Sequence, residues 1–215
     1  MLLALFVCLH FSTFADTTDW KVWKQQKSLS ISSRQSNIEN FTEIKATAIV
    51  KSTLSGFLFF IQNVDNTPKW LTNAYKSEII KVISTSEHIF TVNFSAIWPL
   101  KARYLQLHSK YQQNNDLSIE IELTDDFTIE DKTSNSVRAK VHHSHWLITP
   151  SLTENKEKQL TIEYTFIADS GGKAPRWLTD QLALKYIFKS MKKIRQQLPK
   201  SKWQLHQTSE IKELQ

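Results

Sequence analysis

The sequence predicts an α+β domain in which a curved antiparallel sheet wraps around one long C-terminal helix. Segment 175–198 is the longest clearly amphipathic stretch of the chain. Most of the chain before it has the alternation and composition of short strands separated by polar turns. The length of 215 residues suits one domain of about 180 residues with additional ends. A strand-rich chain that closes with one long helix favours a sheet that grips the helix.

The C-terminal helix is predicted from the spacing of its apolar residues. Gaps of three to five positions place one set of side chains on a single face: Leu178, Leu182, Ile187, Met191, Ile194 and Leu198, with Trp177, Leu184 and Phe188 widening the stripe. Pro175 suits the first helical turn, and Pro199 makes continuation past Leu198 unfavourable. Gly171 and Gly172 allow the chain to turn into the helix, which at about 1.5 Å per residue is roughly 36 Å long.

The other elements follow from local patterns, taken in chain order. A short helix is expected at 18–23, with Thr18 or Asp19 as its cap, and two more at 54–62 and 68–74. The predicted strands cover residues 28–34, 42–50, 75–83, 88–96, 103–111, 117–123, 137–149 and 159–168. No internal repeat or low-complexity segment is present, and the polar residues 201–215 are expected to form a loose tail.

Residues 1–15 have the pattern of a secretory signal peptide rather than of the folded domain. An apolar run from Leu2 to Leu9 carries no charge, and the small residues Thr13 and Ala15 suit cleavage before Asp16. The positive n-region is missing, so a buried N-terminal strand or helix is the alternative. With the signal removed, the domain covers 16–200 and contains no cysteine, because Cys8 is the only one. The expected location is secreted or periplasmic.

Charge and aromatic content restrict the class of partner. Seven Trp and twelve Phe can fill a wide core or line an apolar cavity. The net charge is +6, and cations gather on the last helix at Lys185, Lys189, Lys192, Lys193 and Arg195. These are ordinary surface cations near a helix C-terminus, or they meet anionic lipid headgroups. The basic stretch lacks a stacking array of aromatic residues, so nucleic acid is not expected.

Four stretches, in order, resemble motifs of the START (StAR-related lipid-transfer) domain family, in its bacterial secreted type. They are FTEIKATAIV at 41–50, DNTPKW at 65–70, WPLKAR at 98–103 and DSGGKAPRWL at 169–178. The third resembles W-P-x-x-x-R-D, and the fourth resembles the G-G-x-x-P-x-W-L start of the last helix. The resemblance covers about 20–198. One departure is Tyr104, which stands where the family has Asp after Arg103.

The resemblance implies a helix-grip fold with a deep apolar cavity that binds a lipid or similar ligand without a cofactor. The chain is then expected to be a monomeric binding protein, not an enzyme, that carries hydrophobic molecules between membranes. The residues expected to bind the ligand are Trp70, Phe94, Trp98, Arg103, Trp146, Leu178, Leu182 and Phe188. Two alternatives stay open: an enzyme of the helix-grip superfamily acting on a hydrophobic substrate, and a protein-interaction module without a cavity.

The loop formed by Ile97, Trp98, Pro99 and Leu100 is apolar where polar residues are usual. Trp98 is either part of the lip of the cavity or part of the core. We expect this loop to lie against the front of the last helix, to open there for the ligand, and to touch a membrane transiently together with the basic helix. Arg103 needs a partner if it is buried, which is either a structural carboxylate or the polar head of the ligand.

No catalytic or metal site emerges from the sequence. There is no G-x-S-x-G and no H-E-x-x-H motif. His143 and His145 share one face of the predicted strand and His142 lies on the other. Two histidines are too few for a zinc site, which takes three or four protein ligands, so a solvated strand edge is the expected role.

Overall fold

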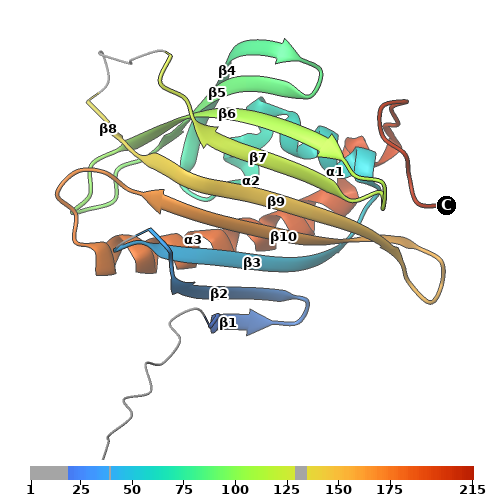
Figure 1. Cartoon of the computed structure of the whole chain (residues 1–215), viewed down its shortest axis with the longest axis horizontal. Helices are drawn as coiled ribbons and strands as arrows, with labels where there is room; N and C mark the ends of the chain where they lie inside the picture. The colour runs from blue at the N-terminus through green and yellow to red at the C-terminus, as the bar shows by residue number, and fades with distance from the viewer. Residues whose placement is uncertain (1–18, 39, 129–134) are drawn as a thin grey trace, which may run out of the picture.

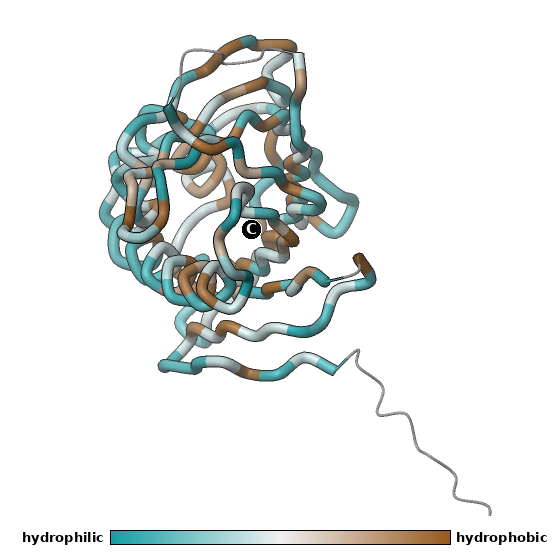
Figure 2. The backbone as a smooth tube through the Cα atoms, turned by 90° about the vertical axis from the view of Figure 1, so that its left-hand side faces the viewer, coloured by the Kyte–Doolittle hydropathy of each residue, from teal (hydrophilic) through white to brown (hydrophobic). Residues whose placement is uncertain are grey.

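The computed structural model describes residues 19–38, 40–128 and 135–215. In these residues one sheet has the order β1-β2-β3-β10-β9-β7-β6-β5-β4, and all of these neighbours are antiparallel. The long helix α3 (Arg176–Gln197) lies along one side of the sheet (Figure 1). Seen from the side, the strands curl into an open ring, with the β1–β2 hairpin at its lower end (Figure 2). The predicted α+β fold is therefore confirmed.

The strands have these bounds: β1 Lys21–Gln26, β2 Leu29–Gln35, β3 Thr42–Lys51, β4 Ala74–Ser84, β5 Glu87–Phe94, β6 Arg103–Gln113, β7 Ile119–Asp125, β8 Val137–Arg138, β9 Lys140–Leu152 and β10 Lys158–Asp169. The short helices are α1 Leu54–Gln62 and α2 Thr67–Trp70. From β2 onward the predicted strands appear within a few residues of their expected bounds. The predicted strand 137–149 is divided, because β8 pairs in parallel with β6 before β9 begins.

The first element is a strand, so the short helix predicted at 18–23 is wrong. The backbone of β1 pairs with β2, and Trp20 beside it lies under the Arg34 guanidinium at 4.4 Å and the Lys45 ammonium at 4.5 Å. These partners come from β2 and β3. Hairpin pairing with β2, together with these contacts of Trp20, therefore outweighs the local capping signal.

Helix α1 forms where the sequence predicts it. The Thr53 side chain accepts a hydrogen bond from the Gly56 N–H at 3.0 Å, as a helix cap does. Leu54, Phe57, Leu58 and Phe60 are buried, so the helix packs into the interior. The predicted helix at 68–74 is shorter than expected, since α2 ends at Trp70.

Helix α3 packs against β2 and β3 through one face, and its buried side chains are Leu184, Ile187, Phe188, Ser190, Met191 and Ile194. The turn before it uses left-handed backbone at Gly171 (φ 67°) and Gly172 (φ 72°), which glycine adopts without steric cost. The Gly171 N–H donates to the Asp169 carboxylate at 2.9 Å. Asp169 therefore stabilises the turn that leads into α3.

Residues 201–215 are not a loose tail, and that prediction is wrong. Trp203 stacks on Phe59 of α1 with ring centroids 6.0 Å apart, and Ile211 is buried in the core. The Glu213 carboxylate accepts hydrogen bonds from the backbone N–H groups of Leu54 (3.1 Å) and Ser55 (2.8 Å). The tail therefore covers α1 and satisfies N–H groups at its start.

Residues 1–15, predicted as a signal peptide, lie outside the described residues. Within the described part of the chain, no helix has the length and apolar composition needed to cross a membrane.

Candidate ligand-binding cavity

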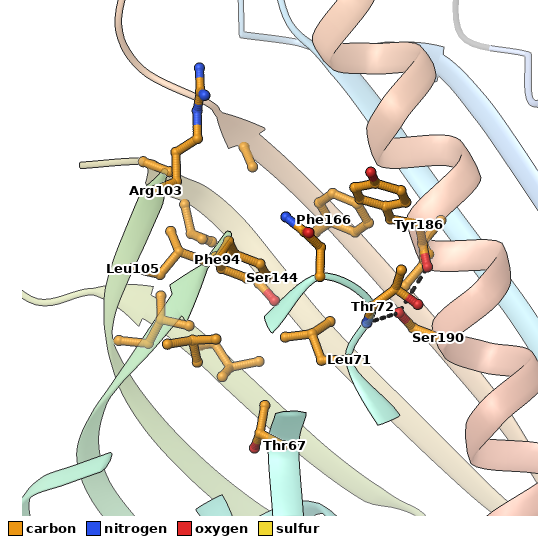
Figure 3. Close-up of a pocket in the computed structure, with 18 of the residues that line it drawn as sticks. Thr67, Leu71, Thr72, Phe94, Arg103, Leu105, Ser144, Phe166, Tyr186 and Ser190 are labelled. Atoms are coloured by element: carbon orange, nitrogen blue, oxygen red, sulfur yellow. Dashed lines mark hydrogen bonds between the residues drawn. The ribbon is translucent and has the colours of Figure 1, made fainter. Parts of the chain in front are cut away.

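A cavity of about 320 Å³ lies between the inner face of the sheet and α3. Its wall is built by alternate residues of neighbouring strands, because successive strand side chains point to opposite faces. On β5 these are His88, Phe90, Val92 and Phe94, and on β6 they are Arg103, Leu105, Leu107 and Ser109. Figure 3 shows Leu71, Phe94, Leu105 and Phe166 around this space, opposite Tyr186 and Ser190 of α3.

The cavity has an open and a closed end. Its exposed lining residues are Ser95, Lys101 and Ala168. Ser95 follows β5 and Lys101 precedes β6, at strand ends that pair with each other, and Ala168 lies beside the turn that precedes α3. We call this end the mouth. At the other end His88, Ser109, Val64 and Thr67 are buried. The cavity therefore reaches solvent near the front of α3 and is closed beyond α2.

The cavity brings together five of the residues predicted from the sequence. Trp70, Phe94, Arg103, Trp146 and Leu182 all line it. Trp70 and Trp146 meet edge to face with ring centroids 6.3 Å apart, which makes a rigid aromatic wall. Their contact with a ligand stays a prediction.

Trp98, Leu178 and Phe188 lie outside the lining. Trp98 is 93% exposed, so it is not a core residue. Leu178 is half-buried in the first turn of α3. Phe188 is buried on the other side of the helix, where its ring meets Trp23 of β1 edge to face at 6.4 Å.

The loop 97–100 divides its apolar side chains between two directions. Ile97 and Leu100 line the cavity, while Trp98 between them is exposed. The Ile97 N–H donates to the Leu100 carbonyl at 3.0 Å, which closes the loop into a tight turn. Thr179 and Leu182 of α3 line the same cavity. The loop and the front of the helix thus both contribute to its wall, and movement between them stays a prediction.

Arg103 has backbone partners and no carboxylate within ion-pair distance among the described residues. Its guanidinium donates to the carbonyls of Ser170 (3.2 Å) and Lys101 (2.5 Å), so the predicted structural ion pair is absent from this part of the chain. Burial lowers the pKa of Arg103, although a guanidinium remains charged in proteins. In Figure 3 its charged end points away from the apolar side chains of the wall.

The wall contains two polar groups that were not predicted from the sequence, Tyr164 and Ser144. The Ser144 hydroxyl donates to the Tyr164 hydroxyl at 3.3 Å, and Tyr164 stacks on Trp146 with centroids 4.1 Å apart. Burial raises the pKa of Tyr164 to about 12. Alternation along β10 could have found it, because Tyr164, Phe166 and Ala168 share one face and all line the cavity.

His88 at the closed end was also missed. Burial lowers the pKa of its imidazole, and the nearby His108 lowers it further, so the ring is neutral at pH 7. His108 is itself paired with Glu87 at 2.7 Å. The cavity lining contains His88 as its one histidine and has no carboxylate among the described residues.

Part of the predicted histidine arrangement at 142–145 is present. The rings of His143 and His145 stack with centroids 6.3 Å apart, as residues on one face can. The pairing of β9 with β10 has a bulge at His142, whose ring contacts Phe41 at 4.4 Å. Among the residues that the structure describes, no group of three or more His, Cys, Asp or Glu side chains could hold a metal ion.

No protein-family model matches the sequence, and no curated protein matches it. Solved structures do share its architecture. Human StAR-related lipid transfer protein 5 is 19% identical with a TM-score of 0.71, over 84% of this chain and 88% of that one. The human StarD13 (DLC2) lipid transfer and protein localization domain is 14% identical with a TM-score of 0.70, over 83% and 88%.

A bacterial structure shares the fold as well. The STAR-related lipid transfer protein from Xanthomonas axonopodis is 18% identical with a TM-score of 0.69, over 84% of this chain and 98% of that one. These likenesses extend over most of both chains and include the curved sheet and the long terminal helix. The chain therefore has the helix-grip fold of START domains.

Proposed function

We propose that the chain binds one lipid or other hydrophobic molecule in the cavity and carries it without chemical change. The observation that supports this is an apolar cavity with a mouth, enclosed between the sheet and α3. Small-molecule sites are concave, mostly apolar, and typically about 300–1,000 Å³ in volume. The names of the structures that share the fold, which are lipid-transfer proteins, favour the same class of ligand.

The lining favours carriage over catalysis. General acid–base chemistry needs at least one positioned group with a suitable proton, and usually a second group that orients it. His88 lies at the closed end, and the lining contains no carboxylate to pair with it in the described residues. The presence of a cavity also argues against the second alternative, a protein-interaction module without one.

Native mass spectrometry after mild purification tests the proposal. We expect a bound mass of one lipid-sized molecule per chain, or its uptake when ligand-free protein is mixed with a lipid extract. Protein that stays ligand-free under both conditions would contradict the proposed function.

We propose further that the mouth contacts an anionic membrane surface while the ligand is exchanged. Trp98, in the loop 97–100, is 93% exposed, and Trp177, in the first turn of α3, is 70% exposed. Exposed cations lie near both: Lys101 follows the loop, and Lys173 and Arg176 lie close to Trp177. Aromatic side chains suit the interface of a bilayer, and cations are attracted to its anionic lipids. Sedimentation with vesicles tests this: binding to anionic vesicles should exceed binding to zwitterionic ones and weaken with salt. Equal binding to both would contradict it.

The proposed location is outside the cytoplasm, in a periplasm, and the chain is proposed to act as a monomer. The location rests on the signal-like residues 1–15. N-terminal sequencing of the protein from its native host should find a start near Asp16. An intact Met1 on cytosolic protein would contradict the location without affecting the binding proposal.

A further inference from the structure

The middle of the cavity wall contains a pair of hydroxyl groups in apolar surroundings. Tyr164 on β10 and Ser144 on β9 both line the cavity, and their oxygens are 3.3 Å apart. Trp146 stacks on one side of Tyr164 at 4.1 Å, and Phe166 stacks beside it at 5.1 Å. The aromatic rings fix the position of the phenol, so its hydroxyl is held in place before any ligand arrives.

The two hydroxyls carry two protons, and the hydrogen bond between them uses only one. Whichever oxygen donates in that bond, the other retains an O–H with no acceptor among the described residues. Both groups remain protonated at neutral pH, since burial raises the pKa of Tyr164 to about 12. A buried donor without an acceptor is unfavourable, because water satisfied it in the unfolded chain.

The remaining proton can meet a ligand only from the cavity side. Ser144 is 4% exposed and is covered by its neighbours, while Tyr164 keeps part of its surface accessible and lines the cavity. Protein atoms surround Tyr164, so its accessible surface faces the cavity rather than bulk solvent. The remaining donor therefore belongs to the wall of the space that a ligand would occupy.

We infer that the ligand carries an uncharged oxygen acceptor, such as a ketone, ester or hydroxyl oxygen, within its apolar body, and that the Tyr164–Ser144 pair donates a hydrogen bond to it. This inference rests on the proposed function and narrows it from hydrophobic molecules in general to oxygen-bearing ones. An uncharged acceptor fits because neither hydroxyl bears a charge and the surrounding wall is aromatic. A plain hydrocarbon chain would leave the donor unpaired.

The test uses long-chain ketones of one length, with the carbonyl at successive positions, and the hydrocarbon of the same length, all delivered from cyclodextrin. We expect at least one ketone to bind the wild-type chain about tenfold more tightly than the hydrocarbon. Tyr164→Phe should reduce this preference, and Tyr164→Phe with Ser144→Ala should remove it. Tyr75→Phe, which removes an exposed hydroxyl on β4 outside the lining, should leave the preference unchanged.

Infrared spectroscopy provides a readout that needs no variant. The carbonyl stretch of the preferred ketone, labelled with ¹³C, should lie at lower frequency when bound to the wild-type chain than in an apolar solvent, as a hydrogen-bonded carbonyl does. A bound-state band at the apolar-solvent frequency would overturn the inference even if the double variant failed to fold.

The outcomes separate this inference from the proposed function. Equal binding of ketones and hydrocarbon would overturn the oxygen acceptor but support a cavity that takes apolar ligands. A preference that persists in the folded double variant would also overturn it, and would direct attention to Thr72 and Trp70, whose side-chain hydroxyl and N–H lack partners in the described wall. Failure of every probe and of a lipid extract to bind would contradict the proposed function itself.

Discussion

At Gly171 the backbone passes so close to Arg138 that a side chain has no room. A Cβ there would lie 2.3 Å from the Arg138 carbonyl oxygen, and the residue has a φ of 67°. The neighbouring Gly172 has a φ of 72°, but its Cβ would meet only the Val137 methyl groups at 3.5 Å or more. The two glycines share the backbone conformation and differ in the space around them.

We therefore expect Gly171→Ala to lower the free energy of unfolding by more than Gly172→Ala does. Left-handed backbone costs an alanine about 1 kcal/mol at either position. Only position 171 adds a backbone clash, which should bring its total to about 2–3 kcal/mol. Urea unfolding of both variants measures the difference. If both variants lose the same free energy of unfolding, the close approach of Gly171 to Arg138 is not maintained in solution.

Tyr164 makes a second prediction at the level of one residue, which concerns alkaline pH. The pKa of Tyr164 is raised from 10.0 to about 12 by burial. Between these values the unfolded chain releases a proton that the folded chain retains, so the free energy of unfolding falls as pH rises from 10 to 12. The loss is on the order of 2–3 kcal/mol. Thermal unfolding of the wild type and Tyr164→Phe from pH 9 to 12 measures it, and equal slopes would show that Tyr164 is not buried.

Single residues also show which features of the site the sequence could not predict. Leu182 and Phe188 belong to one apolar stripe, yet Leu182 lines the cavity and Phe188 packs against Trp23. The stripe is wide because α3 has the cavity on one side and β2 and β3 on the other. Helical spacing shows that both residues are inside but cannot assign the side. Trp98 was ambiguous for a similar reason, since loop geometry decides its 93% exposure.

Among the elements, α1 depends on the C-terminal tail. The Glu213 carboxylate accepts from two N–H groups at the start of α1, where a negative charge also interacts favourably with the helix dipole. We expect Glu213→Ala to lower the free energy of unfolding by about 1–2 kcal/mol. Glu154→Ala, which removes an exposed carboxylate in the β9–β10 turn, is the matched control. If the two variants unfold alike, the tail does not cap α1.

The loop 97–100 gives a prediction about rate rather than stability. Trp98 is 93% exposed, so Trp98→Ala should melt at nearly the wild-type temperature while slowing lipid uptake from vesicles. Trp146 is 4% exposed, and Trp146→Ala should cost about 3–5 kcal/mol. Melting temperature and uptake measured on the same samples check both. Wild-type uptake by Trp98→Ala would refute a role of the loop as a gate.

The elements that the sequence predicts well are those with a strong local pattern. Helix α1 and the turn at Gly171 follow from a cap and a backbone requirement that are visible in a few residues. The predictions for β1 and for the tail were wrong for different reasons. β1 forms a hairpin with the adjacent β2, and the capping residues before it indicated a helix instead. The tail is held by Glu213, whose partner Leu54 is far along the chain, so this contact has no local signature.

At the scale of the whole molecule, the cavity forms where the sheet and α3 pack together, so the sequence of either element alone does not predict it. The family resemblance led us to expect ligand contacts at Trp70, Phe94, Arg103, Trp146 and Leu182, and all of them line the cavity. The volume of about 320 Å³ and the polar pair in its wall depend on how far apart the packed layers lie. That spacing results from many side chains together, which explains why the site was only partly predictable.

The most direct test of the account is to fill the cavity and measure binding. Ala183 of α3 lines the cavity, and Ala183→Trp would place an indole in that space. Gln196→Trp adds the same side chain at an exposed position of the same helix and serves as the control. The measurement is the number of lipid molecules bound per chain by native mass spectrometry, with melting temperature recorded on the same samples. The account predicts one lipid on the wild type and on Gln196→Trp, and none on folded Ala183→Trp; wild-type binding by folded Ala183→Trp would contradict it.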